Sequence, residues 1–199
     1  MSFSLSWIAV KGPSKDAVLA TLGLVEAPEV EEANEEADFP PAFDHSLAEL
    51  PSGWIIILAK DFGYPTPKRM AALSEGGTAI ACSIEEHVMC SVARCYADGQ
   101  AVWSVDHNGG EKGSYHLDVA GAPPPEYAAV RDRLTAVQDA KGGADAQADY
   151  VFDVPGDLSE VLCGYKFDPE RKDGPTFTAL GRAKKAKGGG LLGRLFGRK

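Results

Sequence analysis

The feature that most constrains the fold is the run at residues 54–60, Trp-Ile-Ile-Ile-Leu-Ala-Lys, which is apolar up to its last residue. A strand with one face in water alternates apolar and polar side chains, and this run has no such alternation. It therefore predicts a strand that is covered on both faces and central in its sheet, with helices as neighbours. Thr66 and Pro67 form an N-cap followed by proline in the first helical turn, which predicts a helix over 67–75.

A series of strands joined by short turns follows this helix. Asp98 and Gly99 predict a tight hairpin turn, and a glycine-rich loop precedes the last strand. The last three strands are consecutive, so they predict an antiparallel meander. Alternation in the last strand places Tyr115 and Val119 on a buried face and His116 on the wetter face. The predicted strands cover residues 78–84, 88–97, 101–107 and 114–119.

The remaining periodic segments complete an α+β fold. We predict a mostly antiparallel sheet with a three-strand meander, packed by three to four helices. A chain of 199 residues suits a single domain, which we place at residues 1–168. The additional elements are strands over 3–10 and 150–154 and helices over 15–22, 126–141 and 157–163. Ser14 and Gly23 are predicted to cap the two ends of the helix over 15–22.

Residues 26–41 are predicted to form an acidic, mobile insert. Seven acidic side chains and no basic one lie between Glu26 and Asp38, and Val30 is the single sizeable apolar residue there. Such a segment cannot bury enough apolar area to offset the entropy lost on ordering. It fits a solvated spacer, or an electrostatic partner for the basic tail or for a basic protein.

Residues 169–199 are predicted to form a flexible basic tail that carries a short apolar segment at 191–196. In a helix, the apolar residues of this segment would form one stripe beside a cation, which suits docking into a groove on a protein partner or contact with an anionic membrane surface. Alternatively, the tail is a solubilising end, or it folds back on the acidic body. The predicted binding residues are Leu191, Leu192, Arg194, Leu195 and Phe196.

The net charge of −9 hides a strong asymmetry. Residues 182–199 hold seven basic side chains and no acidic one, so the other 13 basic side chains face 29 acidic ones and leave residues 1–181 at −16. This charge disfavours nucleic acid as a partner of the main domain. The sequence has no secretory signal and no long apolar stretch, so we expect a cytoplasmic protein with reduced cysteines.

Glu85, Glu86, His87 and His116 are the candidate catalytic residues. Carboxylates and imidazoles that converge can act as general acids and bases or bind a metal. The spacing Cys82-x4-His87-x2-Cys90-x4-Cys95 also has zinc-ligand residue types, but these residues lie along predicted strands without the tight turns of a zinc site. The sequence has no phosphate loop, nucleophile elbow or dinucleotide fingerprint, so we expect no metal and no cofactor.

The chain also resembles a set of uncharacterised bacterial proteins of similar length. The likeness covers residues 3–163 and leaves out the tail. It implies one compact domain and no activity. The residues that carry it are Trp7-Ile8-Ala9-Val10-Lys11-Gly12, Ala20, Leu22-Gly23-Leu24, Gly53-Trp54, Glu85-Glu86-His87-Val88-Met89 and Val102-Trp103-Ser104-Val105.

Two functional hypotheses follow from these observations. The first is a non-enzymatic binding or adaptor protein, whose acidic domain contacts a protein partner, as an immunity-type inhibitor of a basic toxin would, and whose C-terminal segment docks elsewhere. The second is a hydrolase-like or metal-dependent enzyme that uses Glu85, Glu86, His87 and His116. A concave pocket that contained at least three of these four side chains would favour the enzyme.

Overall fold

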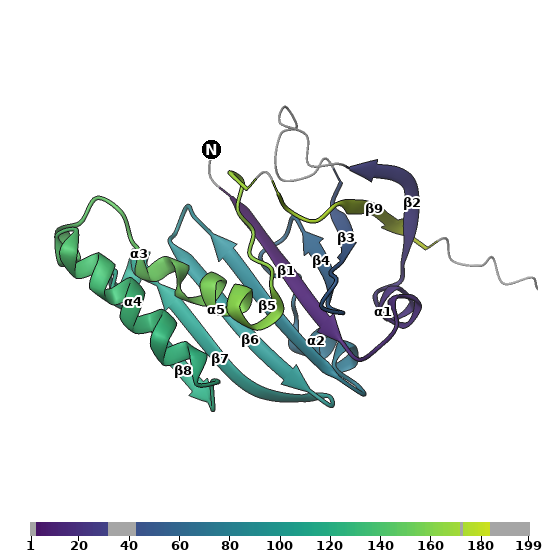
Figure 1. The fold of residues 1–199 in the computed structure, drawn as a ribbon, viewed down its shortest axis with the longest axis horizontal. Coiled ribbons are helices and arrows are strands. Elements are labelled where there is room, and N and C mark those ends of the chain that lie inside the picture. The colour runs from purple at the N-terminus through teal and green to yellow at the C-terminus, as the bar shows by residue number, and fades with distance from the viewer. Residues whose placement is uncertain (1–2, 32–42, 172, 184–199) are drawn as a thin grey trace, which may run out of the picture.

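The computed structural model describes residues 3–31, 43–171 and 173–183. These residues form one nine-stranded antiparallel sheet with five α-helices, which confirms the predicted α+β class (Figure 1). The strand order is β2-β9-β3-β4-β1-β5-β6-β7-β8. The strands are β1 Ser4–Lys11, β2 Leu24–Glu31, β3 His45–Glu49, β4 Ile55–Ala59, β5 Thr78–Glu85, β6 Cys90–Ala97, β7 Gln100–Asn108, β8 Asp118–Gly121 and β9 Phe177–Arg182.

Helices cover both faces of the sheet. Figure 1 shows α4 and α5 lying across one face, and the side chains of α1 and α2 pack in a second core cluster on the other. The helices are α1 Lys15–Leu22, α2 Pro67–Leu73, α3 Gly109–Lys112, α4 Glu126–Ala140 and α5 Val154–Cys163, with 3-10 turns η1 Gly143–Asp145 and η2 Val151–Asp153.

The position of β4 explains its unbroken apolar sequence. Ile56 and Leu58 pack in the core cluster beneath α4 and α5, whereas Ile55 and Ile57 pack in the cluster beneath α1 and α2. All five residues of β4 are buried, as predicted for a strand covered on both faces. The middle strand of the nine is its neighbour β1, which pairs with β4 and β5.

The local signals for turns and caps are confirmed. The Ser14 hydroxyl accepts a hydrogen bond from the Ala17 amide at 3.3 Å at the start of α1. The Thr66 hydroxyl does the same for the third residue of α2. Asp98 and Gly99 have φ angles of 45° and 77°, as a tight hairpin turn with two left-handed residues requires.

Two segments join the sheet where the sequence analysis placed an insert and a tail. The strand β2 extends through Glu31, although residues 26–31 were assigned to the acidic insert. The rest of that insert, residues 32–41, lies outside the described residues. The strand β9 lies between β2 and β3, so the domain extends beyond the predicted boundary at residue 168. Residues 184–199, including the apolar segment 191–196, also lie outside the described part.

The last strand of the meander differs from the prediction. A short helix, α3, follows β7, and β8 begins only at Asp118. Tyr115 and Val119 are 42% and 44% exposed, so their predicted burial is wrong. His116, which was predicted to face water, is instead more buried than Tyr115 and Val119. Its Nδ1 atom accepts a hydrogen bond from the Asn108 amide at 2.9 Å.

Residues 150–154, predicted to form a strand, instead form a 3-10 turn that leads into α5. The Tyr150 amide donates to Gln138 Oε1 at 2.7 Å, and the Phe152 amide donates to the Asp149 carboxylate at 3.1 Å. Val151 and Val154 are both buried, and their spacing fits one helical face. Side-chain oxygens therefore accept the hydrogen bonds that these amides would donate to a neighbouring strand if the segment belonged to a sheet.

Candidate functional site: a pocket around Lys166

The four candidate catalytic residues do not converge in the structure. Glu86 accepts a hydrogen bond from the Phe3 amide at 3.0 Å and lines a pocket. Glu85 is the last residue of β5, and His87 is exposed in the turn that follows. His116 lies beside Asp118, with 3.1 Å between its Nε2 atom and the carboxylate. Of the four residues, Glu86 alone lines the pocket.

The four cysteines do not form a metal site in the described part of the chain. All are free thiols, and Cys82, Cys95 and Cys163 are buried. The residues that the structure describes contain no group of three or more His, Cys, Asp or Glu side chains that could hold a metal ion. Burial raises the pKa of Cys95 to about 11 and raises the pKa of Cys82 well above its ordinary value.

His107, on β7, is the centre of a second polar cluster. His107 Nε2 lies 3.0 Å from Asp149 Oδ2, and His107 Nδ1 lies 2.8 Å from the carbonyl oxygen of His116. The His107 side chain is fully buried, and a Cβ at Gly109 would approach Asp149 Oδ2 to 2.2 Å. The cluster therefore ties β7 to the segments that contain His116 and Asp149.

The pocket lies where the ends of β1 and β5 meet the start of α5 and residues 166–169. Its volume is about 230 Å³. Its walls combine aromatic rings and charged groups from segments far apart in the sequence. The lining includes three aromatic and four charged side chains, namely Trp7, Phe152, Phe167, Glu86, Asp153, Lys166 and Asp168.

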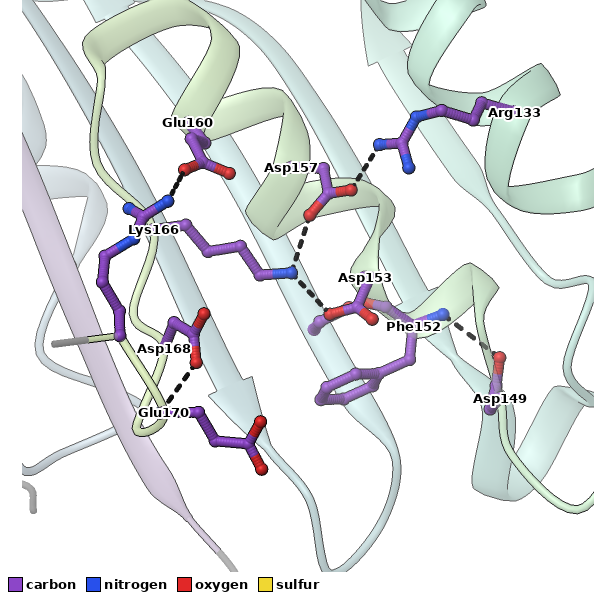
Figure 2. A network of polar contacts seen from close by, with 11 residues as sticks. Arg133, Asp149, Phe152, Asp153, Asp157, Glu160, Lys166, Asp168 and Glu170 are labelled. Atoms are coloured by element: carbon purple, nitrogen blue, oxygen red, sulfur yellow. Dashed lines mark hydrogen bonds and ion pairs between the residues drawn. The ribbon is translucent and has the colours of Figure 1, made fainter. Parts of the chain in front are cut away.

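Lys166 is the centre of the polar network beside this pocket (Figure 2). Its Nζ atom lies 2.9 Å from Asp153 Oδ1 and 2.6 Å from Asp157 Oδ1. Burial alone would lower the pKa of this ammonium group, but the two carboxylates outweigh burial and raise it. Lys166 is therefore held as a cation, 23% exposed, rather than as a neutral base or nucleophile.

The local sequence explains how Lys166 reaches its partners. Asp153 and Asp157 are four residues apart at the start of α5, so they lie on one helical face. Gly164 adopts a left-handed conformation, with φ 82°, and turns the chain back. Tyr165 and Phe167 then point into the core and leave Lys166 directed toward the helix.

Aromatic contacts hold this returning segment against β1. Tyr165 packs edge-on against Trp7 at 5.9 Å, and Phe167 packs edge-on against Phe3 at 5.1 Å. The Trp7 indole also donates a hydrogen bond to Ser159 on α5 at 2.9 Å. The pocket wall is thus fixed by the core rather than by a surface loop.

Further ion pairs extend the network beyond the pocket. Asp157 uses its second oxygen to accept from Arg133 on α4, which joins α4 to α5 (Figure 2). Glu160 pairs with Arg171 after the returning segment. Asp168 accepts a hydrogen bond from the Glu170 amide at 2.9 Å, which fixes the turn at the pocket mouth.

The pocket carries a net negative charge. Three carboxylates and one ammonium group line it, which gives −2 when all four are ionised. Lys166 is already paired with Asp153 and Asp157. Within the described residues, neither Glu86 nor Asp168 has a cation at ion-pair distance. The pocket therefore has negative charge that its own residues do not neutralise, and it would attract a cation.

Sequence reasoning missed this site except for Glu86. The sequence features that could have revealed the site are the two aspartates four residues apart, the glycine that ends the helix, and the sequence Tyr165-Lys166-Phe167. These signals were obscured because residues 150–154 were assigned to a strand.

Comparisons with protein-family models, with curated proteins and with solved structures find no match for this chain. The resemblance to uncharacterised bacterial proteins therefore stays a hypothesis. None of the helices in the described part of the chain has the length and hydrophobicity needed to cross a bilayer.

Proposed function

We propose that the protein is a non-enzymatic binding or adaptor protein, whose acidic domain contacts a protein partner through the pocket around Lys166. The observation that carries this proposal is a preorganised pocket whose charge is not balanced by its own residues. Its ion pairs and aromatic contacts fix the walls before a ligand arrives, which lowers the entropic cost of binding.

The size of the pocket favours one side chain over a whole cofactor. The pocket has a volume of about 230 Å³. Pockets for drug-sized ligands and cofactors usually have volumes of about 300–1,000 Å³. A side chain that projects from a protein surface fits this space, and the rest of the partner would lie on the surrounding surface.

The enzyme hypothesis receives less support from the geometry. The pocket contains Glu86 but not Glu85, His87 or His116. Lys166 is paired with two carboxylates, and its raised pKa keeps it from serving as a nucleophile at neutral pH. No arrangement of nucleophile, base and orienting group lines the pocket, so we place the enzyme second.

The C-terminal segment keeps its role in the proposal. Leu191, Leu192, Leu195 and Phe196 would dock into a second protein groove, with Arg194 as the accompanying cation. An anionic membrane surface is the alternative target of this segment, and the cytoplasm is the compartment we propose.

A pull-down with charge-reversal variants tests the proposal. Wild-type full-length protein is used to recover and identify partners from native cytoplasm, and the affinity for the purified partner is then measured. We expect Asp168→Lys to weaken this affinity at least tenfold, because it places a cation at the pocket mouth. Glu75→Lys makes the same charge change at an exposed residue in the turn after α2, on the opposite face of the sheet, and should have less than a twofold effect. Equal affinities of wild type and Asp168→Lys would refute the role of the pocket.

A further inference from the structure

We infer that the pocket binds a single guanidinium group, carried by an arginine side chain of the protein partner. This inference rests on the proposed function and deepens it by naming the chemistry that the pocket recognises. The ligand would place its cation beside Glu86 and Asp168 and its flat surface against the aromatic wall of the pocket.

The two carboxylates supply the polar part of the recognition. Glu86 Oε2 holds the Phe3 amide, and Asp168 Oδ1 holds the Glu170 amide. These bonds fix the orientation of each carboxylate and use one oxygen of each. Glu86 Oε1 and Asp168 Oδ2 take part in no hydrogen bond among the described residues, Asp168 is exposed, and Glu86 is partly exposed. They are thus acceptors open to a ligand.

The aromatic side chains favour a planar cation. Phe152 and Phe167 both line the pocket, and Figure 2 shows the Phe152 ring beside Asp153. A guanidinium group stacks on aromatic rings and donates several hydrogen bonds in one plane, whereas an ammonium group is a compact and strongly hydrated charge. Arginine therefore satisfies the rings and carboxylates together better than lysine does.

Anions and neutral apolar groups fit this pocket less well than a cation does. An anion would face three carboxylates, and the single lysine is already shared between Asp153 and Asp157. A neutral apolar group would desolvate Glu86 and Asp168 without giving them a donor.

The first experiment titrates the full chain with Nα-acetyl-arginine methylamide and follows backbone amide shifts by NMR. The neutral analogue with citrulline in place of arginine has nearly the same shape and is the matched control ligand. We expect saturable millimolar binding of the arginine compound, with the largest shifts at Gly156 and residues 166–168. The citrulline compound should bind at least tenfold more weakly. Equal binding of the two compounds, or shifts spread over the whole surface, would overturn the inference.

The second experiment repeats the titration with Glu86→Gln/Asp168→Asn, which removes both charges and keeps the shapes of the side chains. We expect at least tenfold weaker binding of the arginine compound, because the guanidinium group would then meet two neutral amide oxygens in place of two carboxylates. Glu75→Gln, in the exposed turn after α2, is the control. The thermal midpoint of each variant shows whether it is folded, and the single variant Asp168→Asn replaces the double one if the latter unfolds. Unchanged affinity in a folded pocket variant would refute the assignment.

A third experiment tests whether the arginine that occupies the pocket belongs to a partner or to the chain itself. Arg194 and Arg198 are the candidates near the end of the tail. If replacing both with glutamine in the full chain tightens binding of the arginine compound threefold or more, the tail itself occupies the pocket. That result would overturn the assignment to a partner, whereas equal affinity supports it.

The outcomes also separate this inference from the proposed function. If the arginine compound does not bind but Asp168→Lys abolishes partner binding, the guanidinium assignment fails and the binding function stands. If the arginine compound binds and Asp168→Lys leaves partner affinity unchanged, the pocket is not the partner site, and both the function proposed for it and the partner's arginine are refuted.

Discussion

Replacing Lys166 with methionine should destabilise the fold in proportion to the charges left without a partner. Methionine keeps the aliphatic stem but removes the cation from Asp153 and Asp157. Removing one member of a buried ion pair costs about 3–5 kcal/mol. Here the Asp153 side chain is 43% exposed and can regain water, and Asp157, at 15% exposed, keeps Arg133. We therefore expect the free energy of unfolding to fall by about 2 kcal/mol, below the range for an isolated buried pair.

Urea denaturation at pH 7 measures this loss, and thermal unfolding should show a midpoint roughly 4–8 °C lower. Lys112→Met is the matched control, because Lys112 pairs with Asp118 through side chains that are 51% and 69% exposed. Its effect should be within about 0.5 kcal/mol. Combining Lys166→Met with Asp153→Asn should cost less than the sum of the two single changes, because the aspartate is no longer charged and unpaired.

The pH dependence gives a second check on the same reasoning. The pKa of Lys166 is raised in the folded protein, after burial is outweighed by Asp153 and Asp157, whereas an unfolded lysine titrates near 10.4. The stabilisation by Lys166 is therefore complete below that value and is lost as the pH rises through the raised pKa. The difference between wild type and Lys166→Met should be constant from about pH 7 to 9 and should shrink above about pH 10.5. A difference under about 0.5 kcal/mol at pH 7, or one that grows in alkali, would refute the ion-pair account.

Three further predictions concern the packing of the fold. Gly77→Ala should lower the free energy of unfolding in urea by roughly 2–4 kcal/mol, because the new Cβ would lie 2.2 Å from a backbone oxygen. Gly23→Ala has open space around it and a φ of 66°, so it should lower the free energy by about 1 kcal/mol. Equal losses for the two variants would contradict the steric argument. Trp7→Phe should cost about 2 kcal/mol through the lost indole hydrogen bond to Ser159, and a loss below about 0.5 kcal/mol would show that this bond contributes little. Cys90, the one cysteine that is not buried, should react first with a thiol reagent at pH 8, and the other three should react only in urea; four equal rates in the native state would show that the core opens.

The sequence was most informative where one short segment carries its own physical signal. Both caps of α1, the N-cap of α2 and the hairpin at Asp98 were predicted because hydrogen bonds and backbone angles within a few residues determine them. The burial of β4 on both faces followed from its lack of alternation. These features needed no knowledge of distant contacts.

The sequence was least informative where a segment forms through distant partners. The strand β9 was not predicted, because its backbone pairs with the distant strands β2 and β3, and Phe177 and Leu180 are buried in core clusters on opposite faces of the sheet. The shift of β8 depends on the contact between His116 and the Asn108 amide. Periodicity within one segment cannot report such contacts.

The candidate site shows the same division. Composition alone determined that the main domain is acidic. Local pattern predicted Glu85, Glu86 and His87 between two strands and His116 on the wetter face of a third, which the structure does not bear out for His116. Only the tertiary structure decided that Glu86 would meet Lys166, Phe152 and Asp168 in one pocket, because these residues come together through the packing of α5 and its returning segment on β1. Side chains some 80 residues apart in the chain share that wall because long-range packing, rather than local propensity, fixes their distance.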